Sequence, residues 1–514
     1  MFLTLFNKEV RQHIMTFRFA AALITTMLLV ILSFWVLGDD YLRRRNAYNL
    51  AAENSAIDNL NVFVPSQISP VLHRPPSALS VFAQGEDRRF GNSSQVRRWE
   101  VPRRAESSFT DNMLMAAEPA LDMFTIISIV LSLFGLLFTY ESVSGERERG
   151  TLKMMCTGQV SRAVIFGAKF FAGIVCLAIP FLLSFISGLL ILTVFFSLSF
   201  SGAQWLNIVL MLLVGLLFGA LFIAVGLASS ALVKKSSIAL VFSLLIWVVT
   251  VLLIPSTAQS TGRLLKPIVS TSEVSVLEKA SMQEAVEKFE LFKEKYPRYW
   301  SGIWTSGFSI PGSGSYLKYD GGDKHFNDAE EFTRFVEDLM IGRAERIWNT
   351  CQKLETEKKQ QASLINWLSL PSPSHHLRNA FTSLAGTDYE GYAGFLDSVR
   401  RYRRQMINDF ENRGYFGSNA LEFFTRRPRS EISDEQYAER RNYYRQQMNL
   451  GRQSAEYMGP SFWGVLPPEK ILPYEPAVNR MDLTTILSSI LFIVLTTIIA
   501  FAIGFIAFVR YDVR

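Results

Sequence analysis

Six long apolar runs constrain the fold of this chain more than any other feature of the sequence. They lie at residues 19–38, 122–140, 166–196, 205–228, 238–255 and 482–509. Each is near or above the roughly 20 residues that an α-helix needs to cross a bilayer. We therefore predict an all-α polytopic membrane protein with six transmembrane helices. Pro180 lies inside the third run and is expected to kink or divide it.

Lysine and arginine in the short loops orient these helices, because cytoplasmic loops carry an excess of both residues. The loops at 141–165 and 229–237 and the tail at 510–514 are basic, whereas 197–204 has neither residue. We therefore place both termini and the basic loops in the cytoplasm, and segments 39–121 and 256–481 outside. The basic run Arg43–Arg45 disagrees, but its segment is long enough to translocate largely regardless of charge.

Residues 1–18 precede the first run and form an amphipathic pattern. Their apolar residues recur at spacings of three and four, namely Leu3, Phe6, Val10, Ile14 and Phe17. This periodicity predicts a helix that lies in the cytoplasmic interface of the membrane.

The two outside segments differ in how many helix-breaking residues they contain. Segment 39–121 is rich in proline, glycine and arginine, which favours short extended or looped elements over long helices. Segment 256–481 shows helical periodicity at about 272–296, 328–363 and 388–410, and a fourth helix is expected at 434–448. We predict a mainly helical outer domain with segment 39–121 packed against it.

Two positions in the outer domain carry helix-boundary signals. Ser374 is expected to cap a helix whose first turn holds His375 and His376, in preference to a metal site, because adjacent histidines point in different directions. Gly386 is expected to end one helix, with Thr387 or Asp388 capping the next.

The charged loop between the second and third runs is the most distinctive short segment. In this loop, Gly150 predicts a turn, and Thr151 an N-cap for a short helix over about 151–157 that Gly158 would stop. Leu152, Met155 and Cys156 would lie opposite Lys153 on that helix. An amphipathic helix held between two membrane spans is suited to being gripped by another protein.

Several functional classes are excluded or left without support by the sequence. The P-loop spacing of glycine, lysine and hydroxyl is missing, so the chain does not bind ATP by that device. The interiors of the six runs lack ionisable residues, with Asp122, Glu141 and Lys169 at their ends, so ion-coupled transport is disfavoured. No spacing indicates a catalytic or metal site. The net charge of +6 lies around the membrane runs, which argues against nucleic acid as a partner.

Small residues inside the runs permit close helix packing. Gly215 and Gly219 are four residues apart in the fourth run, and Gly504 lies in the sixth. Ordinary packing within one chain is the expected use of these glycines. The three cysteines, Cys156, Cys176 and Cys351, fall in three separate regions, so no disulfide framework is expected.

The loop at 141–165 also resembles a known family. Glu146, Glu148 and Gly150–Leu152, followed by Val160–Arg162 and Gly167–Lys169, are similar to the cytoplasmic signature of ABC type-2 export permeases, the membrane subunits of ATP-binding-cassette transporters. Gln159 stands where the family usually has proline. The stretches 372–377, 384–388 and 395–403 resemble a subgroup with a large outer domain between spans five and six.

The resemblance implies a mechanism and partners. The helix at 151–157 would be the coupling helix, seated in a groove of a separate ATPase subunit that holds ATP and Mg; no cofactor is implied for this chain. Glu148, Gly150, Thr151 and Leu152 would position that helix, and Arg147 and Arg149 would meet the ATPase. The full set implied for ATPase coupling is Glu146, Arg147, Glu148, Arg149, Gly150, Thr151, Leu152, Lys153 and Arg162.

The working unit implied by the family contains two permease chains, identical or paralogous, and two ATPases. We accordingly expect a permease of the bacterial inner membrane that exports or extracts an unidentified substrate, with its large domain in the periplasm and lipid around its spans. A membrane-anchored periplasmic scaffold or signalling subunit is the alternative. A periplasmic enzyme is a third possibility with no motif behind it.

Overall fold

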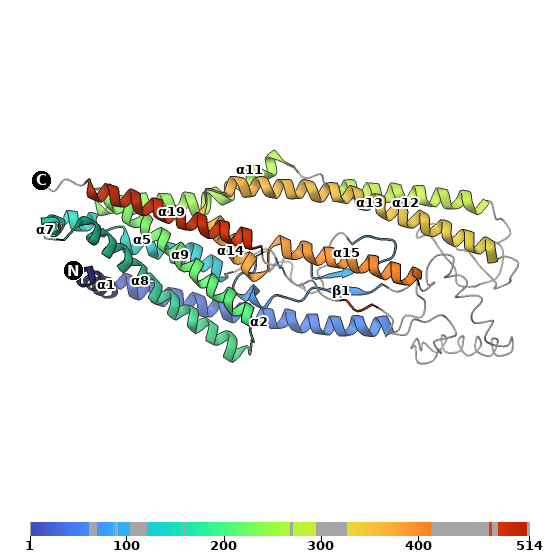
Figure 1. The fold of residues 1–514 in the computed structure, drawn as a ribbon, viewed down its shortest axis with the longest axis horizontal. Coiled ribbons are helices and arrows are strands. Elements are labelled where there is room, and N and C mark those ends of the chain that lie inside the picture. The colour runs from blue at the N-terminus through green and yellow to red at the C-terminus, as the bar shows by residue number, and fades with distance from the viewer. Residues whose placement is uncertain are drawn as a thin grey trace.

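The chain forms an elongated, mainly helical molecule with a bundle of apolar helices at one end and separate outer helices at the other (Figure 1). The computed structural model describes residues 2–60, 69–85, 87, 91–102, 121–157, 160–267, 271–294, 326–412, 472–474 and 482–510. Both termini lie at the bundle end of the molecule (Figure 1).

Six helices are long and apolar enough to cross a membrane, which confirms the predicted fold class. Three of them contain a π-helical turn, at Ile126–Leu131, Ile191–Phe195 and Val248–Leu253. The helical segments of the six spans are α2 (Phe17–Leu60), α4 (Met123–Thr125) with α5 (Ser132–Thr139), α8 (Arg162–Leu190), α9 (Gly202–Leu232), α10 (Ser236–Trp247) with α11 (Ile254–Leu265), and α19 (Leu483–Val509). Pro180 lies within α8 without dividing it.

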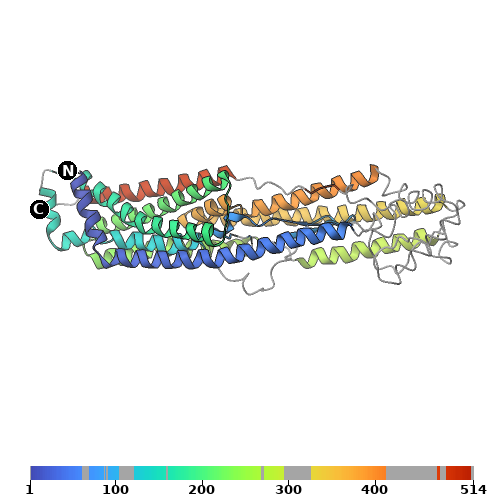
Figure 2. The same cartoon turned by 90° about the horizontal axis from the view of Figure 1, so that it is seen from below.

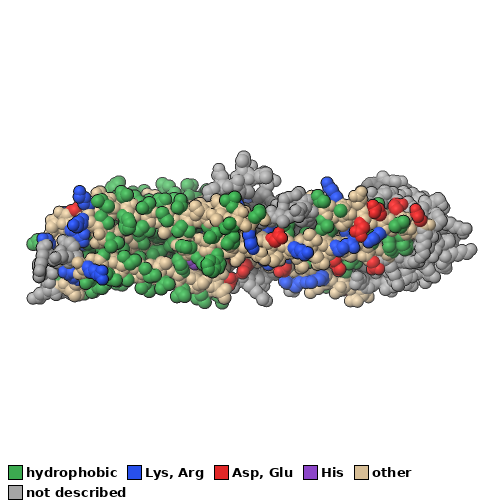
Figure 3. All heavy atoms as spheres, turned by 90° about the horizontal axis from the view of Figure 1, so that it is seen from above, with side chains coloured by type: hydrophobic (Ala, Val, Ile, Leu, Met, Phe, Trp, Pro, Cys, Tyr) green, Lys and Arg blue, Asp and Glu red, His purple; other side chains and the backbone are tan. Residues whose placement is uncertain are grey.

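The fourth span, α9, lies at the centre of the bundle. In its most apolar stretch 61% of the residues are buried, compared with 17% in α19 and 22% in the fifth span. On the face that Figure 3 shows, apolar side chains cover the bundle, and lysine and arginine gather at the end that holds both termini, called the inner end below. Charges of both signs mark the other half of that face. This distribution is that of a chain with one lipid-facing and two water-facing zones.

The glycines of spans four and six lie where helices approach closely. A Cβ atom added at Gly504 would lie 2.8 Å from the Cα of Ala228 on α9. Added at Gly219 or Gly215, it would lie 2.6 Å from Leu177 or 2.9 Å from Ile127. These positions fit the intramolecular packing expected for them.

The described residues of the outer part lie mainly in four helices. They are α12 (Thr271–Glu294), α13 (Phe326–Ser369), α14 (Pro373–Ala385) and α15 (Tyr389–Asn412). Three of them match the helices predicted from periodicity, whereas the helix predicted at 434–448 lies outside the described residues. Figure 2 shows α12, α13 and α15 extending away from the bundle beside the end of α2.

Segment 39–121 departs from its prediction at its start, because α2 continues unbroken to Leu60. The proline and glycine residues that argued against a long helix begin only at Pro65. Before them, Asp39 pairs with Arg43 at 2.8 Å and Asp40 with Arg44 at 2.9 Å, both at the i,i+4 spacing that supports a helix. Further on, β1 (Val71–His73) and β2 (Ser93–Gln95) pair antiparallel, with Leu72 opposite Ser94.

At the inner end, α1 (Phe2–Ile14) runs across the ends of the spans, as Figure 2 shows. It packs on α8, where the ring of Phe2 lies 6.3 Å from that of Phe171. A break at Met15–Thr16 separates it from α2. A separate helix therefore covers Phe2–Ile14 of the range 1–18 predicted for it, whereas Phe17 and Arg18 belong to α2.

Candidate functional site

The loop between spans two and three, residues 141–161, is called the link below. It forms two short helices at the inner tip of the molecule (Figure 1). They are α6 (Ser144–Glu148) and α7 (Thr151–Thr157), and α7 has the bounds predicted for it. Gly150 joins them with φ of +74°, a backbone conformation that glycine adopts without strain. The hydroxyl of Thr151 donates to the carbonyl of Glu146 at 3.3 Å, closing the turn in place of the expected N-cap. Gly158 and Gln159 lie outside the described residues.

One face of α7 is buried against the spans and the other is open. Leu152 is fully buried in a cluster with Val143, Phe166 and Leu227, which come from the link, α8 and α9. Arg149, Thr151 and Lys153 are exposed, and the side chain of Met154 is 77% exposed. The side chain of Cys156 lies outside those described. The open face therefore presents the thioether of Met154 together with the cations of Arg149 and Lys153.

The charged residues of α6 point back to three spans. Glu146 accepts from Lys169 of α8 at 2.8 Å. Arg147 donates to the carbonyls of Ala231 and Val233, at 3.4 and 3.2 Å, near the C-terminal end of α9. Glu148 accepts from the backbone N–H of Ser236 at 2.9 Å, at the start of α10. A cation at a helix C-terminus and a carboxylate at a helix N-terminus are both favourable, so α6 is fastened to all three.

Two further arginines tie the inner end together. Arg162, at the start of α8, donates to the carbonyl of Val509 at the end of α19. Arg18 of α2 pairs with Glu141 at 2.8 Å and donates to the hydroxyl of Tyr140 at 3.0 Å. Every span thus has a polar or packed contact near the link.

The set that the family resemblance implied for ATPase coupling therefore divides in two. Glu146, Arg147, Leu152 and Arg162 face the spans, and Glu148 is exposed but bonded to α10. Arg149, Gly150, Thr151 and Lys153 are open to solvent. Arg147 was expected to meet an ATPase, but its guanidinium lies against the end of α9. Met154, which the sequence did not single out, is the most exposed apolar side chain among the link residues that the structure describes.

Sequence reasoning missed a buried charge cluster beside the link. Because α8 begins at Arg162, Lys169 lies about two turns inside it and is 2% exposed. Its ammonium lies 3.0 Å from a carboxylate oxygen of Glu9 and 2.8 Å from one of Glu146. The sequence does carry one sign of this cluster. Glu9 is a charged residue on the same face of the first helix as Phe6 and His13, which are three and four residues away.

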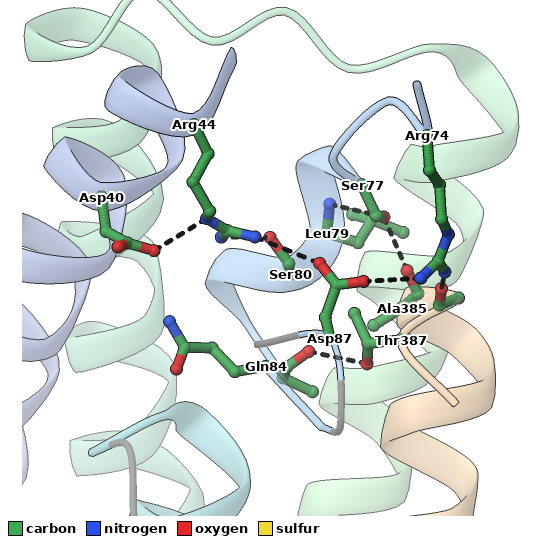
Figure 4. Close-up of polar contacts among 12 residues, drawn as sticks. Asp40, Arg44, Arg74, Ser77, Leu79, Ser80, Gln84, Asp87, Ala385 and Thr387 are labelled. Carbon is green, nitrogen blue, oxygen red and sulfur yellow. Dashed lines mark hydrogen bonds and ion pairs between the residues drawn. The ribbon is translucent and has the colours of Figure 1, made fainter. Parts of the chain in front are cut away.

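At the outer end, a polar corner joins α2 to the loop before span two and to the turn after α14 (Figure 4). Asp87 lies between Arg44 of α2 and Arg74, at 3.1 and 2.9 Å. Arg74 also donates to the carbonyl of Gly386 at 3.1 Å, and Thr387 donates to that of Ala83 at 2.9 Å. The corner thereby fixes segment 39–121 to the outer domain.

The turn after α14 has the form expected from its sequence. Gly386 ends α14 in the left-handed region, with φ of +67°. Asp388 then caps α15 by accepting from the N–H of Gly391 at 3.0 Å. The expected cap at the start of α14 is wrong by two residues, because Ser372 caps the helix and Pro373 takes its first position. Proline is favoured there since its missing N–H needs no partner.

The helix α14 lies across the outer ends of spans four, five and six, and the amide of Asn207 on α9 donates to the carbonyl of Leu384 at 3.1 Å. Ser372 and Ser374 donate to the carbonyls of Thr250 and Val251, at 2.6 and 3.1 Å, in the π-helical turn of span five. The ring of His376 stacks on Phe492 of α19 at 3.9 Å. Burial beside His376 and Arg378 lowers the pKa of His375 to about 4, so this imidazole stays neutral at ordinary pH. The outer domain is thus built directly onto the bundle.

Metal ligation finds no support among the residues that the structure describes, where no three His, Cys, Asp or Glu side chains gather. His375 instead contacts Asn379 at 3.0 Å.

Comparison with known proteins gives one family. The family model described as "ABC-2 family transporter protein" matches residues 3–513. The match includes the link, all six candidate spans and the outer helices. No curated protein sequence gave a significant match.

Proposed function

The chain belongs to the ABC-2 transporter family and is a membrane subunit of such a transporter, and from this we propose that α7 docks on the ATPase and couples ATP hydrolysis to export or extraction of a substrate across the bacterial inner membrane. Permeases of this family are typically non-catalytic, with the ATPase in a partner subunit. The large outer domain then lies in the periplasm.

The observation that carries the proposal is the division of the link into an open face and a fastened base. Arg149, Lys153 and Met154 are exposed at the inner tip of the molecule. The Nε–H of Arg149 also donates to the carbonyl of Gly145 at 3.1 Å. The base is held by Leu152 and by the charges of α6, which reach α8, α9 and α10. A push on α7 is therefore delivered to several spans at once, which a coupling element requires.

The open face also indicates the chemistry of the surface that receives it. An exposed methionine adapts to an apolar pocket, and the flanking cations fit an acidic rim. ATP and Mg belong to that partner. A second permease chain, identical or paralogous, would complete a unit with two ATPases, so that each permease receives one push per cycle.

Charge reversal on the open face tests this proposal. We expect the double variant Arg149→Glu/Lys153→Glu to reduce co-purification of the ATPase by about tenfold or more, since like charges now face the acidic rim. The matched control is Lys234→Glu/Arg510→Glu, which reverses two exposed cations that follow α9 and α19 at the same end of the molecule. Equal ATPase recovery from wild type and the link variant, with both inserted in the membrane, would remove the link from the docking surface.

A signalling or scaffold subunit remains the second candidate, and the continuity of two spans with outer helices favours it. The first span continues as α2 to Leu60, and the fifth continues as α11 to Leu265. Transport and signalling can be distinguished by measuring hydrogen exchange of α12 and α13 with and without ATP, together with solute movement, in the complete complex. Outer helices that respond to ATP while no solute moves support signalling, and solute movement supports transport.

A further inference from the structure

The amphipathic helix α1 contacts both spans that the link connects. It reaches α8 through Phe2 and Phe171, and its His13 ring lies 6.1 Å from that of Phe138 on α5. The thiol of Cys176 on α8 also lies 3.8 Å from the carbonyl of Val10. Since α1 leads into the first span at Phe17, it lies at the level of the membrane surface. A helix placed in this way is part of the moving assembly as well as an anchor.

The Glu9–Lys169–Glu146 cluster joins α1, α8 and α6 in one buried bridge. The side chains of Glu9, Lys169 and Glu146 are 6%, 2% and 12% exposed. At such low exposure the attraction between the charges is strong, and a carboxylate without its partner is costly. The link therefore cannot move away from Lys169 without changing the hold of Lys169 on Glu9.

The face of α1 that turns away from α8 matches an anionic lipid surface. Lys8 and Arg11 are exposed there, and Leu3 and Ile14 are exposed beside them. Apolar side chains of this kind enter the boundary of the acyl chains, and lysine and arginine contact anionic headgroups. Glu9, the only acidic residue of α1, is buried on the opposite side and leaves the lipid-facing charge positive.

We propose that α1 senses anionic phospholipid in the cytoplasmic leaflet and that the Glu9–Lys169–Glu146 bridge transmits its position to the ATPase-docking link. The inference rests on the proposed function of the link. Because coupling between sites is reciprocal, lipid that holds α1 alters the link, and docking on the link alters the contact of α1 with lipid. Lys169 is a positioning residue in this account.

The test uses the complete permease–ATPase complex in nanodiscs of phosphatidylcholine, with and without phosphatidylglycerol. We expect the ATPase rate of wild type to differ about fivefold or more between the two lipids. In Glu9→Gln the two rates should become nearly equal, because the bridge to α1 is broken while Lys169 keeps Glu146. In Lys8→Gln/Arg11→Gln the difference should also collapse, because the headgroup contacts are lost. A simple loss of structure would lower both rates without changing their ratio.

A second measurement separates this inference from the proposed function. Met154→Cys, in a chain whose three native cysteines are replaced by alanine, reports the state of the link through its rate of maleimide labelling without any ATPase. We expect phosphatidylglycerol to change that rate, and Glu9→Gln to remove the change. The inference would be overturned if the labelling rate of Met154→Cys did not depend on lipid. It would also be overturned if Glu9→Gln and Lys8→Gln/Arg11→Gln left the lipid response undiminished. A lipid-dependent labelling rate in a chain that recovers no ATPase would refute only the docking role of the link.

Discussion

Replacing Lys169 with methionine should destabilise the chain by about 3–5 kcal/mol, because it leaves the carboxylates of Glu9 and Glu146 buried without their shared cation. The expected readout is a marked fall in the thermal unfolding temperature of the purified protein in detergent. Docking of the ATPase should weaken as well, since the base of the link loses its attachment to α8. Both measurements are needed, because stability and docking depend on the same contacts.

Two control variants distinguish charge pairing from loss of the lysine stem. Lys288→Met removes a cation whose pair with Glu284, at 2.6 Å, is about half exposed, and should leave the unfolding temperature close to that of wild type. The triple variant Lys169→Met/Glu9→Gln/Glu146→Gln removes all three charges and should unfold at a higher temperature than Lys169→Met alone. If Lys169→Met is as stable as wild type, the bridge is not a structural element of the inner end.

The second large effect is expected at the outer corner. Asp87→Asn should cost about 3–5 kcal/mol, because Arg44 and Arg74 are both largely buried and share this carboxylate. Without Asp87 to position its guanidinium, Arg74 should also lose its hydrogen bond to the carbonyl of Gly386. We expect a lower unfolding temperature and faster hydrogen exchange in the backbone around Gly386, where the outer domain meets the bundle.

The chain supplies a matched control for this substitution. Asp39→Asn makes the same chemical change on α2, the helix that carries Arg44, but the pair of Asp39 with Arg43 is exposed. An exposed pair contributes about 0–1 kcal/mol, so this variant should behave almost as wild type. If Asp39→Asn and Asp87→Asn lower the unfolding temperature equally, the buried ion pairs of Asp87 do not hold the outer domain to the bundle.

Much of the fold was predictable because membrane spans and helix boundaries depend on local sequence. The six apolar runs, the bounds of α7 and the turn at Gly386 all follow from hydropathy, amphipathic spacing or a left-handed glycine. The long extension of α2 does not follow from the composition of segment 39–121, because its proline and glycine residues all lie after residue 64. The composition of a whole segment does not indicate where within it a helix ends.

The contacts of the site were less predictable because they join residues far apart in sequence. Glu9 meets Lys169 across 160 positions, and Arg74 meets Gly386 across 312. Loop charge assigned Arg147 to the cytoplasmic side but gave no sign that it turns toward the end of α9. Met154 was overlooked because exposure depends on how α7 docks through Leu152, which a helical period alone does not determine.

Cross-linking from Met154 tests the central claim most directly. A photoreactive phenylalanine analogue at Met154, in the complete complex, should form a covalent adduct with the ATPase subunit. The same analogue at Met15, which is 72% exposed at the same end of the molecule, should not. Adducts from Met154 alone are the predicted result. An ATPase that co-purifies with the chain but cross-links from Met15 and never from Met154 would contradict docking through α7.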